Sequence, residues 1–148
     1  MRQFHVALAL PIILLAGAAT ALAAEFGTAA EAQAMLQRAV AAIQADKAKA
    51  LEMFTEGGGG FKDRDLYPYC GDLDGKFTAH PTLVGRSLKD LKDKTGKAFG
   101  TEIYTVAEVA EIKEVAYMWP RPGQTEPVQK SAFVTKVGDQ ICGVGYYK

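Results

Sequence analysis

The amino-acid sequence predicts an α+β domain: a five-stranded antiparallel sheet with a long N-terminal helix and a short second helical segment. Three observations support this fold class. An amphipathic run covers residues 28–56, an Asp-Gly turn joins two strand-like runs within 66–80, and three further strand-like runs follow residue 111. The order of helix, two strands, helical crossing and three strands fits a sheet with helices on one of its faces.

Residues 1–23 have the pattern of a secretory signal peptide. Arg2 supplies a weak positive charge, an almost wholly apolar run follows over 6–19, and an A-x-A cleavage motif ends at Ala23. The alternative is a retained membrane anchor, but the apolar run is shorter than the ~20 residues that span a bilayer. We therefore expect export to the periplasm with cleavage after Ala23, which leaves a single domain over 24–148.

The composition of the mature chain limits the kinds of partner. Without Arg2, 16 Lys and Arg residues face 17 Asp and Glu residues. This balance leaves no basic footprint for nucleic acid, so we expect no nucleic acid partner. The length suffices for one domain with one core. No later segment is apolar over enough residues to span a membrane, so we expect a mature product that is free in the periplasm.

A long helix is expected over residues 28–56. Thr28-Ala29-Ala30-Glu31 has the S/T-x-x-E form of a capping box, which begins a helix. Apolar residues then recur at spacings of three and four with polar residues between them, which predicts an amphipathic helix of about seven turns. Four glycines at 57–60 end it. No Gly-Lys-Ser/Thr follows them, so a flexible hinge is favoured over a phosphate loop.

The sheet is expected over residues 61–148. The first two strands, at 66–70 and 76–80, flank an Asp-x-Asp-Gly turn at 72–75, and glycine accepts the positive φ that such a turn requires. A polar connector follows and includes a short helical turn around 87–91.

The second half of the chain continues with a helical segment over 101–110, where apolar residues share one side. Strands are then expected at 112–119, 128–137 and 140–147. Pro-Arg-Pro-Gly and Gly-Asp form the two turns between these strands.

Several short motifs in this order carry a family resemblance. The hairpin block contains D-L-Y-x-x-C, D-x-D-G, A-H-P, L-V-G and D-L-x-D within residues 65–93, and YMWPRP, K-x-x-F and GVGYY occupy 117–122, 130–133 and 143–147. Together they resemble the single-Cache family of extracytoplasmic sensors over nearly all of the mature chain. The resemblance implies a PAS-like sheet and a domain that senses rather than catalyses, with small carboxylates among its ligands. One departure is Glu108-Val109-Ala110-Glu111, where the family usually has a glycine-containing turn, so the end of the second helix stays undetermined.

Cys70 and Cys142 are the only cysteines of the chain. Two cysteines in an exported protein suggest a disulfide. In the PAS-like sheet that the resemblance implies, the first and last strands are neighbours, which makes this pairing geometrically reasonable. The alternative is two buried thiols that act as small hydrophobic side chains.

A pocket for a small carboxylate is expected between the third and fourth strands and the first hairpin. Aromatic rings can form its walls, a guanidinium grips a carboxylate through two hydrogen bonds, and an ammonium acts as a compact charge. The expected ligand-contacting residues are Tyr67, Tyr69, His80, Tyr117, Trp119, Arg121, Lys130 and Phe133, with Lys130 as the first choice of charge partner. Alternatively, these aromatic residues belong to the core and Arg121 points into water. Phe133 shares a face with Lys130 only if a bulge intervenes.

Catalytic and metal sites are not expected. His80 is the single histidine of the mature domain, which argues against a zinc site, and a hydrogen-bonded structural role is its alternative to ligand contact. A Cys-His pair of His80 with Cys70 or Cys142 is conceivable, but a disulfide would remove both thiols. The Asp-x-Asp-Gly turn fails as a calcium loop, because Cys70 and Pro81 occupy positions that require carboxylates.

The sequence therefore predicts a sensing or binding module for a small carboxylate, without a cofactor and without enzymatic activity. We expect it to act in signal transduction such as chemotaxis, with a separate membrane receptor or histidine kinase. The alternatives are an interaction scaffold that binds no ligand and a small periplasmic enzyme. Related sensors often pair through the first helix, so the resemblance also allows a homodimer.

Overall fold

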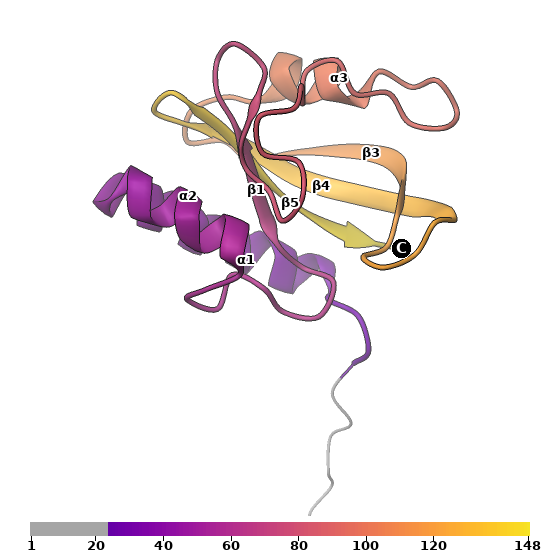
Figure 1. The fold of residues 1–148 in the computed structure, drawn as a ribbon, viewed down its shortest axis with the longest axis horizontal. Coiled ribbons are helices and arrows are strands. Elements are labelled where there is room, and N and C mark those ends of the chain that lie inside the picture. Colours follow the sequence, from indigo (N-terminus) through magenta and orange to yellow (C-terminus); the bar gives the residue numbers. More distant parts are fainter. Residues whose placement is uncertain (1–23) are drawn as a thin grey trace, which may run out of the picture.

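The computed structural model describes residues 24–148, and the signal peptide predicted over 1–23 lies outside this part of the chain. Five strands form one antiparallel sheet in the order β2-β1-β5-β4-β3 (Figure 1). The strands are β1 (Pro68–Gly71), β2 (Phe77–Ala79), β3 (Lys113–Pro120), β4 (Pro127–Val137) and β5 (Gln140–Tyr147). The predicted fold class is confirmed, and the first and last strands are neighbours in the sheet.

Three helices accompany the sheet: α1 (Ala29–Ala45), α2 (Lys47–Glu56) and α3 (Phe99–Val106). The capping box begins α1 as predicted, because the Thr28 hydroxyl accepts from the Glu31 backbone and the Glu31 carboxylate accepts from the Thr28 backbone. Among the helices of the described residues, none is long and apolar enough to cross a bilayer.

The prediction of one continuous helix over 28–56 was wrong, because the helical conformation is interrupted at Asp46. This residue has an extended backbone (φ −158°, ψ 97°), ends α1 and caps α2, where its side chain accepts from the backbone N–H of Lys49. Aspartate favours such cap positions because its short carboxylate satisfies a free helix N–H. The chain then returns toward the middle of α1, where Arg38 donates to the Gly60 carbonyl.

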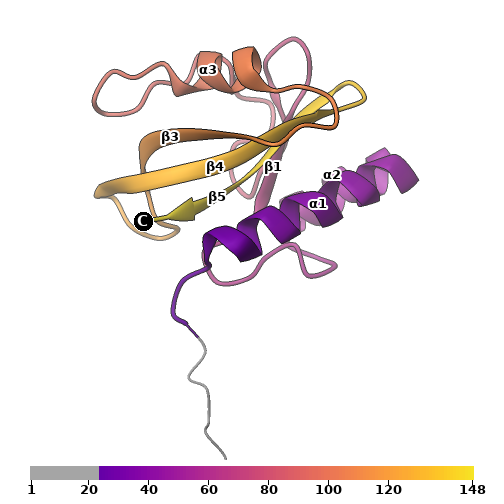
Figure 2. The same cartoon turned by 180° about the vertical axis from the view of Figure 1, so that it is seen from behind.

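The helices cover both faces of the sheet, and not one face as predicted. Helices α1 and α2 lie against one face and α3 lies against the other, which both views show (Figure 1, Figure 2). Successive side chains of a strand point to opposite faces, so Cys142 and Val144 join the core beside α1 while Ile141 joins the core beside α3. Because both faces of β5 are apolar, each requires a cover of its own.

The connector and the second helical segment also differ from the prediction. Helix α3 starts at Phe99 and ends at Val106, and Ala110 has a positive φ of 61° that is incompatible with a helix. The helical turn expected around 87–91 is present only as a single turn, in which the Leu91 N–H donates to the Leu88 carbonyl. Ser87, which precedes this turn, makes an isolated bridge with Lys76 of the hairpin. This contact holds the connector across the face of the sheet that α3 covers.

A disulfide joins the first and last strands. Cys70 of β1 lies directly opposite Cys142 of β5, and their sulfur atoms are bonded. The bond lies on the α1 side of the sheet, in the core cluster that includes Val144. Both sulfurs are thereby removed from nucleophilic chemistry.

Candidate ligand-binding site

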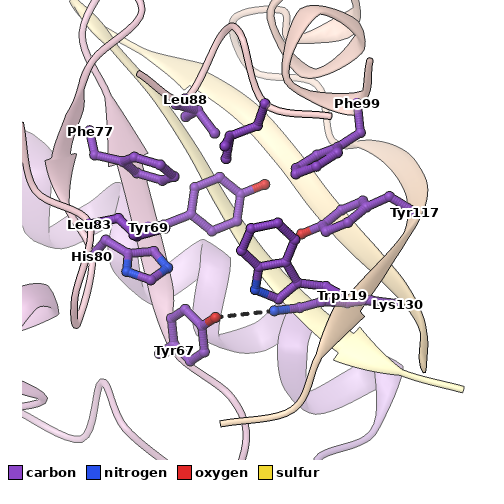
Figure 3. A pocket seen from close by; sticks show the side chains of 11 residues that line it. Tyr67, Tyr69, Phe77, His80, Leu83, Leu88, Phe99, Tyr117, Trp119 and Lys130 are labelled. Atoms are coloured by element: carbon purple, nitrogen blue, oxygen red, sulfur yellow. Dashed lines mark hydrogen bonds between the residues drawn. The ribbon is translucent and has the colours of Figure 1, made fainter. Parts of the chain in front are cut away.

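A small cavity lies on the face of the sheet that α3 and the connector cover (Figure 3). Its volume is about 20 Å³. A water molecule needs roughly 10–15 Å³ of such space, so the cavity has room for one or two water-sized groups. The side chains that line it are Tyr67, Tyr69, Phe77, His80, Leu83, Leu88, Leu91, Phe99, Tyr117, Trp119 and Lys130.

Lys130 of β4 places a cation at the base of this cavity. Its side chain is only 2% exposed, and its ammonium donates to the Tyr67 hydroxyl over 3.2 Å. The same Nζ lies 4.8 Å from the ring centroids of Tyr67 and Tyr147, so two aromatic faces partly offset its lost hydration. The Tyr67 hydroxyl accepts this bond, and its own hydrogen therefore stays available to another acceptor.

No carboxylate of the described residues lies within 4.0 Å of the Lys130 ammonium. Burial lowers the pKa of Lys130 to about 7, and the negative charge of Asp65 opposes this shift only in part. A buried cation without a paired anion is unfavourable, and here one hydrogen bond and two aromatic rings replace only part of the hydration that the ammonium lost. An anion placed beside this ammonium would therefore lower the cost of burying the charge.

Two glycines of β5 create the space that Lys130 and Tyr69 occupy. A Cβ atom at Gly145 would collide with the Lys130 side chain, and one at Gly143 would lie 2.5 Å from the Tyr69 hydroxyl oxygen. Lys130 pairs with Tyr147 across β4 and β5, so it lies on the same face as these glycines. The alternating glycines of the closing strand thus accommodate two cavity side chains.

His80 lines the cavity immediately after β2. Its Nδ1 accepts from the backbone N–H of Thr82 over 3.0 Å, which leaves Nε2 as the protonated nitrogen of the neutral ring. Burial and the charge of Lys130 lower the pKa of His80 to about 4. At neutral pH the ring is therefore an uncharged donor rather than a second cation.

The remaining aromatic residues form the walls. Tyr117 stacks on Phe99 of α3 with ring centroids 4.1 Å apart, and Trp119 contacts Phe99 edge-on at 5.6 Å. The Tyr69 hydroxyl is buried and has no hydrogen-bond partner among the described residues. Burial raises the pKa of both Tyr69 and Tyr117, so their hydroxyls stay protonated.

Arg121 does not line this cavity. Its guanidinium packs over the rings of Phe26 and Tyr147, at 4.0 and 4.7 Å from their centroids, and its Nη1 lies 3.9 Å from the buried Oδ2 of Asp65. The alternative in which Arg121 points into water is also not what the structure shows, because its side chain is 15% exposed. It borders a larger outer cleft of about 790 Å³.

The expected role of Phe133 in the pocket was wrong. Strand β4 runs without a bulge between Lys130 and Phe133, so side chains three positions apart point to opposite faces. Phe133 lies on the α1 side, where it stacks on Tyr146 with centroids 5.5 Å apart.

The structure thus gathers six of the eight expected residues around one cavity and leaves out Arg121 and Phe133. Sequence reasoning missed Tyr147, whose register with Lys130 places its ring over the ammonium. The signal for Tyr147 was present in the sequence, because residues 143, 145 and 147 of one strand lie on the same face of the sheet. It also missed Leu83, Leu88 and Leu91, because the connector reads as a polar loop. No three His, Cys, Asp or Glu side chains within residues 24–148 gather as a metal site.

Comparisons with known proteins agree with this architecture. The family model described as "Single Cache domain 2" matches residues 12–146. The methyl-accepting chemotaxis protein McpP of Pseudomonas putida is 33% identical in an alignment 90 residues long, which covers 57% of this chain and 16% of that protein. The chain therefore spans only a small part of the length of this curated relative.

Solved structures share the fold. One described as the periplasmic sensor domain of a chemotaxis protein is 27% identical, with a TM-score of 0.61, over 78% of this chain and 86% of that one. A methyl-accepting chemotaxis protein from Vibrio parahaemolyticus is 23% identical, with a TM-score of 0.63, over 80% and 86%. A Cache chemosensory domain described with carboxylic acid recognition is 24% identical, with a TM-score of 0.56, over 78% and 84%.

The family match covers far more than half of the chain, and the antiparallel sheet, its strand order and the structural neighbours are consistent with it. The chain belongs to the single Cache domain 2 family.

Proposed function

We propose that this protein is a periplasmic sensor domain that binds a small carboxylate at Lys130 and acts with a separate membrane signalling partner. The observation that carries the proposal is the buried Lys130 ammonium, which has no paired carboxylate within residues 24–148. A carboxylate beside it would restore the charge partner that burial removes.

The neighbouring donors favour an anion over a neutral ligand. The Tyr67 hydroxyl accepts from Lys130 and keeps its own hydrogen to donate, and its pKa of about 12 keeps that hydrogen in place at neutral pH. The neutral His80 ring has its Nε2–H as a remaining donor, since Nδ1 is occupied by Thr82. Three donors and no free carboxylate acceptor therefore converge on a space of about 20 Å³.

The relatives support the sensing role rather than an enzymatic one. The similar proteins are described as chemotaxis receptors or their periplasmic sensor domains. One protein of the same fold is described as recognising carboxylic acids. The membrane partner of this chain, a receptor or a histidine kinase, is proposed from the receptor relatives, of which this chain spans only a part.

Calorimetric titration with matched pairs of acids and amides tests the proposal. Propionate is expected to bind and propionamide is not, because only the acid supplies the charge. A charge-assisted hydrogen bond contributes roughly 1.5–3 kcal/mol, so Lys130→Met should weaken binding by at least about tenfold. Lys136→Met, on the same strand, serves as the matched control.

Two results would contradict the proposal. If no acid of a broad carboxylate panel binds the folded wild-type protein, the interaction-scaffold alternative is favoured. If Lys130→Met binds the acids as tightly as Lys136→Met does, the charge partner is wrong.

A further inference from the structure

Two spaces meet at the candidate site. The inner cavity at Lys130 holds about 20 Å³, and the outer cleft holds about 790 Å³. Four side chains line both spaces: Tyr67, His80, Leu83 and Trp119. We call these four residues the neck, because they border both the inner cavity and the outer cleft.

The inner cavity is too small for a complete organic acid. Its volume accommodates one or two water-sized groups, which is the size of a carboxylate head without the rest of a ligand. The outer cleft, in contrast, has the volume of a site for a small organic molecule. An acid whose head reaches Lys130 must therefore leave its body in the neck and the cleft.

We propose that the inner cavity takes only the carboxylate head and that the neck and outer cleft hold the body of the ligand, which makes the site selective for carboxylates with an extended apolar chain. This inference rests on the proposed function. It specifies the size and polarity of the ligand, and it proposes that the neck residues select ligands by their apolar chain.

The lining of the outer cleft fits an apolar body. Its lining includes Phe61, Met118, Pro120, Pro122 and Pro127, and these side chains offer apolar contact without hydrogen-bond donors. The charged residues that line the cleft are mostly cationic, and this balance favours the approach of an anion. The cations are Lys62, Arg64, Lys92, Lys94 and Arg121, and the carboxylates are Glu56 and Asp93. The cleft therefore attracts the negative charge of the ligand and offers an apolar surface to the ligand's hydrocarbon chain.

Leu83 is the neck residue that can be changed with the least effect on the fold. It is half-buried in the segment after β2, and Trp119 lies across the cavity from His80 and Leu83 (Figure 3). The adjacent Val84 is 52% exposed and lines neither space. Val84→Ala is thus a matched control for Leu83→Ala.

The test is a calorimetric titration of the full mature chain with straight-chain monocarboxylates from acetate to octanoate. A fully buried methylene group is worth about 0.8 kcal/mol, or about fourfold in affinity, and less in an open cleft. We expect affinity to rise about two- to fourfold per added methylene over the first few. Leu83→Ala should reduce this increment and weaken hexanoate about fivefold, while acetate changes less than twofold and Val84→Ala binds like the wild type.

The outcomes separate this inference from the proposed function. Acetate binding as tightly as hexanoate, or Leu83→Ala matching Val84→Ala across the series, overturns the inference and leaves carboxylate binding at Lys130 intact. Binding that Lys130→Met does not weaken overturns the proposed function. The absence of binding by every acid, in protein that still unfolds cooperatively, overturns both.

Discussion

Replacing Lys130 by methionine should stabilise the ligand-free protein at neutral and acidic pH. Methionine retains most of the length of the side chain and removes the charge that burial penalises. The pKa of Lys130 is about 7 in the folded protein and 10.5 for an ordinary lysine. Between these two values the unfolded chain binds more protons than the folded one, so the contribution of Lys130 to the free energy of unfolding rises with pH.

The size of the effect follows from the two pKa values of Lys130. One pKa unit corresponds to about 1.4 kcal/mol, so the penalty for the charged form is about 5 kcal/mol well below pH 7. At pH 9 the folded side chain is neutral while the unfolded one is still charged, and the penalty falls to about 2 kcal/mol. Methionine also leaves the Tyr67 hydroxyl without its donor, which costs about 1–3 kcal/mol at every pH.

The assay is urea or guanidinium unfolding of the wild type and Lys130→Met from pH 6 to pH 9, without ligand. The stability difference between the two proteins should shrink by about 3 kcal/mol over this range, in favour of the wild type. Lys136→Met, compared with the wild type in the same way, should show no such slope. A difference between Lys130→Met and the wild type that is independent of pH would refute the argument that the buried ammonium carries the penalty.

Two further predictions concern the closing strand. Gly145→Ala should displace Lys130, destabilise the protein by about 1–3 kcal/mol and weaken carboxylate binding. Gly58→Ala should have none of these effects, because a Cβ there meets only ordinary contacts with Met53 and its φ is not positive. Equal calorimetric and unfolding results for the two variants would contradict this. Replacing both Cys70 and Cys142 by alanine should lower the free energy of unfolding by up to about 4 kcal/mol, because the bond closes a loop with a sequence separation of 72 residues. An unchanged denaturant midpoint relative to the oxidised wild type would show that this constraint is not significant.

Local patterns predicted those parts of the fold that depend on neighbouring residues. The capping box at Thr28 and the hairpin turn before Gly75 are specified within a few positions, since each needs only its own side chains and backbone angles. The closing strand was also predicted correctly at 140–147 because the Gly-Asp turn before it marks its start. Asp46 was missed because an aspartate inside an amphipathic pattern reads as a residue of its polar face.

The family, the sheet and the aromatic and basic residue types of the candidate site could all be predicted from the order of the amino acids. Which of these side chains lie together depends on contacts between distant segments. Strand register directs Phe133 to the opposite face and places Tyr147 over Lys130. Arg121 lies outside the cavity, with its Nη1 3.9 Å from Asp65 Oδ2. The burial of Lys130 without a paired carboxylate depends on segments that are distant in the chain, and no local pattern records it, because desolvation is a property of the assembled core.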